Sequence, residues 1–178
     1  MVSLWYQDTS KQLMVKVIKA RNLMNTELVG KADPYVKMTL WHKDQLIKKA
    51  KTDTIKKSLD PVFNKVELFD LPELGEEGLK SIKLVFTVMD KDWGKDDFIG
   101  RLVIGGSVDG SGLQHWNKVI AEPLVETEVW HPLSETGVNA FIDKNKPTVI
   151  DKKEQPSNDK KEPLMIDKKE PTLITLVK

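Results

Sequence analysis

The sequence contains no cysteine and no long hydrophobic run, and each absence excludes a class of function. Without cysteine the chain forms no disulfide, thiolate metal site or S-palmitoyl anchor, which fits a reducing, cytoplasmic compartment. No apolar run approaches the ~20 residues that span a bilayer. The N-terminal segment lacks the pattern of a signal peptide, and Val2 excludes N-myristoylation. We therefore expect any membrane contact to be peripheral, on membranes or vesicles.

The sequence also has little net charge. A formal charge of +1 excludes a globally basic nucleic-acid binder, so we expect no nucleic-acid partner. The 178 residues, 39% of them hydrophobic and 31% charged, are enough for one ordinary domain and a tail.

Alternating apolar residues predict β-strands in the first 136 residues. Side chains at every second position are apolar around residues 13–17, 36–40 and 82–88, the period of a strand with one buried face. Turn-forming residues separate these runs, and short strands at this spacing favour an all-β antiparallel sandwich. Residues 112–121 instead follow helical spacing, so we expect one short helix before the last strand.

The composition changes after residue 136. Short segments of the type IDKKEP recur at 142, 150, 158 and 166, a period too short for a solenoid. The isolated apolar residues among these charges cannot build a core. We therefore predict a domain at 1–136 and a disordered, low-complexity tail at 137–178, with a short docking motif near 173–178 as the alternative.

Two acidic clusters follow strand-like runs, one from Glu27 to Asp33 and one from Asp90 to Asp97. Two carboxylates ~4 Å apart repel by about 4 kcal/mol at an effective dielectric of 20. A fold that gathers several carboxylates without basic partners needs a cation. Oxygen-only ligands suit a hard cation such as Ca²⁺, which takes six to eight of them.

Other interpretations of the second cluster are weaker. An EF-hand loop starting at Asp90 would need glycine at its sixth position and glutamate at its twelfth, where this chain has Lys95 and Arg101. A phosphohydrolase with an aspartate nucleophile would need alternating helices, which the all-β pattern lacks. A solvated acidic turn stays open as an alternative.

Four motifs in fixed order resemble the C2 domain family. They are GKADPYVK at 30–37, DPVFN at 60–64, DKDWGKDDFIG at 90–100 and WHPL at 130–133. The GLQHWNKVI segment is most similar to the second C2 domain of synaptotagmins. The resemblance covers residues 1 to about 135. It implies an eight-stranded antiparallel β-sandwich of synaptotagmin-like topology, with calcium-binding loops at one end.

The resemblance also implies a set of metal ligands. Carried over residue by residue, these are Glu27, Asp33, Asp90, Asp92 and Asp97, with Asp96 as a spare carboxylate at the rim. Glu27 stands where the family usually has aspartate. The loop between Asp92 and Asp97 is one residue shorter than in typical synaptotagmins. Both departures would weaken the site or reduce the number of bound ions without removing it.

Apolar and basic residues near the acidic clusters suggest membrane contacts. Leu28, Val29 and Trp93 suit loops that dip into a lipid interface, where tryptophan is favoured, although Trp93 folded back on its own loop is the alternative. A lysine-rich stretch resembles the polybasic strand that meets phosphoinositides in the family: Lys48, Lys49, Lys51, Lys56 and Lys57. A solvated edge strand protected by lysine is the alternative there.

The remaining sequence features narrow the hypotheses. Leu124 and Val125 replace an arginine pair that the family often has before its WHxL motif, which weakens the expectation of contacts that depend on that pair. His42, His115 and His131 are dispersed and have no neighbouring acid or nucleophile pattern, so we interpret them as structural. The sequence contains no nucleophile–base pair of the kind that would indicate an enzyme.

Two functions therefore follow from the sequence. The first is a calcium-dependent phospholipid-binding module in vesicle trafficking and regulated exocytosis. Its partners would be phosphatidylserine, phosphoinositides and SNARE or other trafficking proteins. The second is a calcium-independent C2 interaction domain, which binds phosphoinositide or a protein through its lysine-rich strand.

Overall fold

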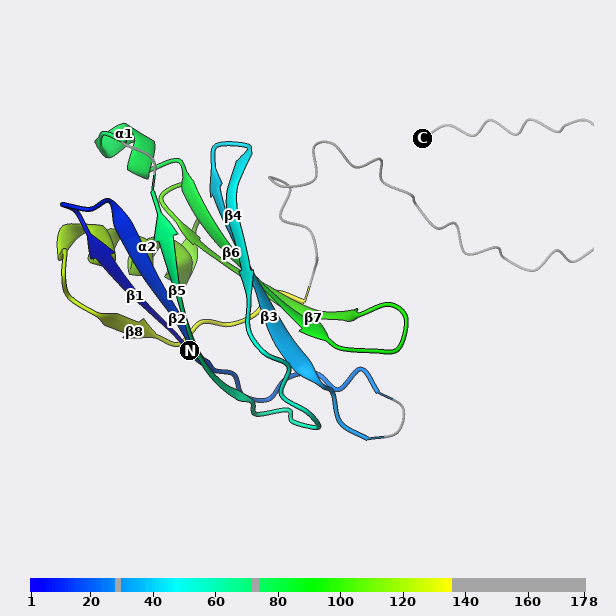
Figure 1. Cartoon of the computed structure of the whole chain (residues 1–178). Helices are drawn as coiled ribbons and strands as arrows, with labels where there is room; N and C mark the ends of the chain where they lie inside the picture. The colour runs from blue at the N-terminus through cyan, green and yellow to red at the C-terminus, as the bar shows by residue number, and fades with distance from the viewer. Residues whose placement is uncertain (28–29, 72–73, 136–178) are drawn as a thin grey trace, which may run out of the picture. The chain divides into compact units, whose positions relative to one another are not determined.

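The structure, a computed structural model, describes residues 1–27, 30–71 and 74–135 (Figure 1). Eight strands and two helices form in this part of the chain, in the order β1 (Val2–Gln7), β2 (Gln12–Lys19), β3 (Pro34–His42), β4 (Gln45–Lys51), β5 (Val62–Asp70), α1 (Glu76–Leu79), β6 (Ile82–Asp90), β7 (Asp97–Gly105), α2 (Gly110–Ala121) and β8 (Thr127–Val129). The predicted tail at 137–178, and the predicted insertion residues Leu28 and Val29, lie outside the described residues.

The strands form two four-stranded sheets. One sheet has the order β5-β2-β1-β8 and the other β4-β3-β6-β7, and every pair within them is antiparallel. The inward side chains of both sheets share one buried core, as expected when two amphipathic sheets stack. The predicted eight-stranded antiparallel sandwich is confirmed.

The period-two pattern places the core as expected. Leu13, Val15 and Val17 of β2 are buried, while their even-numbered neighbours are half-exposed. The predicted helix is α2, which begins two residues earlier than expected and buries Trp116. Gly112 lets the helix approach β7 closely, because a Cβ at this position would lie 2.1 Å from the carbonyl oxygen of Val103. The one-turn helix α1 was not predicted, since four residues carry too little periodicity.

Three loops meet at one end of the sandwich. They are the β2–β3 loop (20–33), the β4–β5 loop (52–61) and the β6–β7 loop (91–96), seen toward the lower right of the sandwich in Figure 1. Backbone hydrogen bonds join them: Ser58 N–H donates to Ala32 O at 2.9 Å, and Lys91 N–H donates to Asp33 O at 3.0 Å. This end carries both acidic clusters of the sequence.

No helix in the described part of the chain is both long and apolar enough to cross a membrane.

Candidate functional site

Strand register brings the two acidic clusters together. Asp90, the last residue of β6, is opposite Pro34 at the start of β3 and opposite Asp97 at the start of β7. Asp33 immediately precedes Pro34, so residues 57 positions apart in sequence become neighbours. The predicted meeting of Asp33 with the Asp90 cluster is present.

Asp90 is the most constrained of these carboxylates. Its side chain belongs to a residue that is only 1% exposed. Asp33 N–H donates to Asp90 Oδ1 at 2.6 Å, and the Thr26 hydroxyl donates to Asp90 Oδ2. These two hydrogen bonds give both carboxylate oxygens a partner, which compensates for the loss of water around a buried carboxylate. Asp90 thereby ties the β2–β3 loop to the end of β6.

Asp33 links all three loops. Its Oδ1 accepts a hydrogen bond from the backbone N–H of Lys57 at 2.7 Å, and its carbonyl accepts one from Lys91 N–H at 3.0 Å. The following proline restricts Asp33 to extended backbone, which holds the carboxylate at the junction of loop and strand. The β4–β5 loop therefore takes part in positioning the acidic cluster, a role that the sequence did not reveal.

The other predicted ligands are more open to solvent. Asp92 and Asp97 are exposed, Glu27 is half-exposed, and Asp92 Oδ1 accepts the N–H of Trp93 at 2.6 Å. Partial desolvation, followed by repulsion from Asp90, Asp92, Asp33 and Asp97, raises the pKa of Glu27 above its ordinary value. The two acidic clusters of the sequence therefore form one group of mutually repelling carboxylates at the loop end.

No lysine or arginine forms an ion pair with the predicted ligands among the residues that the structure describes. None of the ion pairs there involves Glu27 or the four predicted aspartate ligands, which are Asp33, Asp90, Asp92 and Asp97. Across residues 1–27, 30–71 and 74–135, no three acidic or histidine side chains converge closely enough to hold a metal ion. The oxygen-only donor set suits a hard cation in its chemistry, but side-chain rotation would have to bring the oxygens together.

The prediction that Asp96 is a spare carboxylate is wrong, because its side chain has two protein partners. It accepts a hydrogen bond from the Tyr35 hydroxyl at 2.5 Å and pairs with Lys91 Nζ at 2.9 Å. The Tyr35 bond and then the Lys91 bond lower the pKa of Asp96 to about 2. Asp96 thus anchors the β6–β7 loop to β3, and it is already occupied by protein partners.

Trp93 lies at the tip of the β6–β7 loop and is fully exposed. The alternative, in which its ring folds back on the loop, is therefore wrong. An indole ring held in water next to carboxylates is unfavourable for an isolated domain, and it suits a surface that meets an amphipathic partner.

The predicted lysines occupy three different places. Lys49 and Lys51 are exposed on the outward face of β4. Lys48 instead reaches β5, where it pairs with Glu67 at 2.8 Å and donates to Leu68 O at 2.6 Å. Lys56 and Lys57 are exposed in the β4–β5 loop, close to Asp33. Alternation along β4 separates Lys48 from Lys49, because successive side chains point to opposite faces of a sheet.

The outward face around β4 carries further positive charge. Lys37 of β3 is exposed, and it is the register partner of Lys51 and of Thr87, which in turn is opposite Arg101. The next row contains Lys49, Thr39, Val85 and Val103. These two rows contain no acidic side chain. Sequence reasoning missed Lys37, since it stands alone in a run of apolar residues.

Two histidines are in contact, although they are dispersed in the sequence. His115 of α2 and His131, after β8, stack with ring centroids 5.1 Å apart and share a hydrogen bond of 2.9 Å. His115 Nε2 must donate to the carbonyl of Thr127, so its Nδ1 accepts from His131 Nε2, and His131 Nδ1 accepts from the Ser111 hydroxyl. This Ser111–His131–His115 chain fastens the segment after β8 to α2.

Comparison with known proteins agrees with this architecture. The family model described as "C2 domain" matches residues 11–119. The chain is 38% identical to Synaptotagmin-C of Diplobatis ommata over 145 residues, or 80% of this chain and 26% of that protein. It is 37% identical to human Synaptotagmin-7 over 134 residues, or 75% of this chain and 32% of that protein. The chain thus spans about a quarter to a third of these relatives.

Solved structures give the same fold. A C2 domain of RIM from Drosophila superposes with a TM-score of 0.53 at 25% identity, over 60% of this chain and 83% of that one. The third C2 domain of the KIAA1228 protein gives a TM-score of 0.56 at 20% identity, over 77% and 87% of the two chains, which shows the fold alone. The sandwich with its loop cluster is a non-enzymatic binding module. The chain belongs to the C2 domain family, and it is similar to synaptotagmins over most of its length.

Proposed function

We propose that this C2 domain binds anionic phospholipid membranes in response to Ca²⁺ and serves vesicle trafficking and regulated exocytosis, as a peripheral protein on the cytoplasmic side. The observation that carries the proposal is the acidic cluster at the loop end. In the described part of the chain, none of its predicted ligands forms an ion pair. The likeness to synaptotagmins supports it.

The proposed ligands divide into two groups. Asp33 and Asp90 are fixed by hydrogen bonds from the loop backbone and Thr26, so they would supply a preformed base of the site. Glu27, Asp92 and Asp97 are exposed or half-exposed and would close over the ion by side-chain rotation. A bound Ca²⁺ would supply the positive charge that the cluster lacks, and open coordination positions for lipid phosphate oxygens.

Exposed residues around the cluster would supply the membrane contacts. Trp93 is fully exposed at the tip of the β6–β7 loop and would enter the interfacial region of the bilayer. Leu28 and Val29, which the sequence places beside Glu27, remain proposed as insertion residues. Lys56 and Lys57 lie on the same loop end, and each lysine near an anionic leaflet contributes ~1 kcal/mol.

Vesicle co-sedimentation tests this proposal. We expect the chain to pellet with phosphatidylserine vesicles in the presence of Ca²⁺ and to stay in the supernatant with a chelator. Binding to neutral phosphatidylcholine vesicles serves as the control for charge dependence. Equal sedimentation with calcium and with chelator would overturn the calcium response.

A second candidate function is a calcium-independent interaction through the basic face. Its support is the pair of rows containing Lys37, Lys49 and Lys51 without an acidic side chain, together with the lack of convergence among the carboxylates in the described part of the chain. Phosphoinositide headgroups or an acidic protein segment, such as one in a SNARE protein, fit this surface. This candidate predicts that the chain sediments with phosphoinositide vesicles in chelator. It also predicts that the double variant Lys49→Gln, Lys51→Gln does not.

A further inference from the structure

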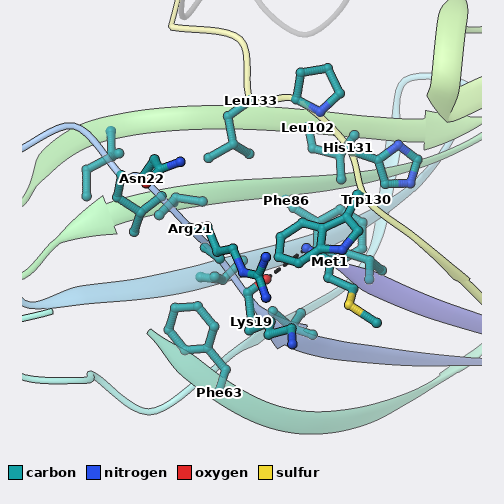
Figure 2. Close-up of a pocket in the computed structure, with 18 of the residues that line it drawn as sticks. Met1, Lys19, Arg21, Asn22, Phe63, Phe86, Leu102, Trp130, His131 and Leu133 are labelled. Carbon is teal, nitrogen blue, oxygen red and sulfur yellow. Dashed lines mark hydrogen bonds between the residues drawn. The ribbon is translucent and has the colours of Figure 1, made fainter. Parts of the chain in front are cut away.

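A half-open cavity of about 490 Å³ is lined by residues of both sheets, by the start of the β2–β3 loop and by the segment that follows β8 (Figure 2). Apolar residues of both sheets form its wall: the half-buried Phe63, and, at its base, the core residues Val17, Val36, Phe86, Val88 and Leu102. The volume falls within the roughly 300–1,000 Å³ of small-molecule sites in proteins. An apolar cavity of this kind favours a hydrocarbon chain over water.

The mouth of the cavity is positively charged. Arg21 and Trp130 are both exposed, and Figure 2 shows their side chains next to each other. The Arg21 guanidinium carbon lies 4.9 Å from the Trp130 ring centroid, and Lys19 Nζ lies 5.8 Å from it. Neither cation forms an ion pair within the described ranges. A guanidinium stacked on an indole keeps its N–H edge free for a planar anion.

The other titratable groups at the cavity do not cancel this charge. His131 lines the cavity, but both ring nitrogens are engaged, and burial followed by the charge of His115 lowers the pKa of His131 to about 4. Among the described lining residues Glu135 is the single acid, and it is exposed at the rim. The mouth therefore favours an anion.

We propose that this cavity binds a fatty acid, with the acyl chain against the apolar wall and the carboxylate beside Arg21 and Lys19. The apolar wall would bury successive methylene groups, each of which adds to affinity. Arg21 would hold the carboxylate through paired N–H donors. The predicted calcium ligands do not line the cavity, so the site acts independently of the acidic cluster.

Calorimetric titration in chelator tests the assignment. The probe is dodecanoate below its micelle concentration. The matched control is dodecyltrimethylammonium, which has the same chain length and the opposite charge. We expect saturable binding of dodecanoate, and binding of the cation at least about tenfold weaker. Similar affinities for both, or no binding of dodecanoate, would overturn the proposal.

Two variants locate the binding. Ala20→Phe places a ring in the cavity from a half-buried lining position and should abolish dodecanoate binding. Arg21→Gln removes an exposed headgroup contact and should weaken binding about tenfold, which keeps the test decisive if Ala20→Phe does not fold. Lys118→Gln, on the exposed face of α2, removes the same charge elsewhere and should bind like the parent chain. Unchanged affinity in Arg21→Gln would contradict the site.

Discussion

Asp92 is the residue whose role can be tested most directly, because it is exposed and its side chain accepts a hydrogen bond from its own loop. Asp92→Asn keeps the shape of the side chain and removes its charge. We expect this variant to be at least as stable as the parent chain in chelator, because it removes a charge that repels Glu27, and to lose most of its calcium-dependent sedimentation with phosphatidylserine vesicles. Asp8→Asn, in the turn between β1 and β2, is the matched control. A full calcium response in Asp92→Asn would remove Asp92 from the ligand set.

Removing the charge of Glu27 should raise the stability of the calcium-free chain. The pKa of Glu27 is raised in the folded state, so the folded chain holds this proton more tightly, and it loses stability as pH rises from the ordinary value of 4.5 through the higher folded value. Glu27→Gln should therefore raise the urea midpoint at pH 7 in chelator while reducing the stabilisation that Ca²⁺ gives. Glu122→Gln, also exposed, should change neither quantity. A lower midpoint in Glu27→Gln would show that the carboxylate is not repelled by its neighbours.

Tyr35 and Asp96 also form a residue-scale test. The pKa of Asp96 is lowered to about 2, so the bond contributes stability above the ordinary value of 3.8, and this contribution is lost as pH falls toward 2. Tyr35→Phe should lower the unfolding midpoint at pH 7 and differ less from the parent chain near pH 2. Urea unfolding at both pH values measures this. An equal deficit at both would indicate lost packing instead of a lost bond to the carboxylate.

At the scale of elements, α2 depends on its contact with β7. A methyl group at Gly112 would lie 2.1 Å from the Val103 carbonyl oxygen, a backbone atom that cannot move aside. Gly112→Ala should therefore cost about 1–3 kcal/mol of unfolding free energy, the range of overpacked cores. Gly75→Ala, where no atom lies within 4 Å, is the control. Equal stability of the two variants would contradict the close approach of α2 to the sheet.

The histidine chain between α2 and the segment after β8 makes the fold sensitive to acid. Burial is the main cause that lowers the pKa of both His115 and His131, so the unfolded chain binds protons that the folded chain does not. Stability should fall as pH drops from the ordinary histidine value of 6.5 toward 4. His131→Gln should flatten that slope in urea titrations between these values. An unchanged slope would show that the pair titrates normally.

Strand and helix positions could be predicted from the sequence where periodicity is regular, and side-chain partners could not. Leu13, Val15 and Val17 identified the buried face of β2 because a strand alternates with period two. The contact between His115 and His131 was missed because it depends on how the segment after β8 turns back to α2. Lys48 and Lys49 were grouped by composition, although alternation sends them to different surfaces.

At the scale of the whole molecule, the convergence of three loops at one end follows from the sandwich topology. The acidic clusters could be paired from the sequence only through the resemblance to C2 domains, because nothing local relates Asp33 to Asp90. The involvement of Asp96 with Tyr35 needed the structure, since it depends on the path of the β6–β7 loop. The fold therefore places a basic face and an acidic loop end on the same sandwich.

Calcium titration by calorimetry, with and without phosphatidylserine vesicles, tests the central claim most directly. We predict measurable calcium binding by the chain alone and tighter binding with vesicles, since lipid phosphate would complete the coordination of the ion. The thermal midpoint should rise with calcium under the same conditions. No heat of binding and no thermal shift at millimolar calcium, with vesicles present, would contradict the account.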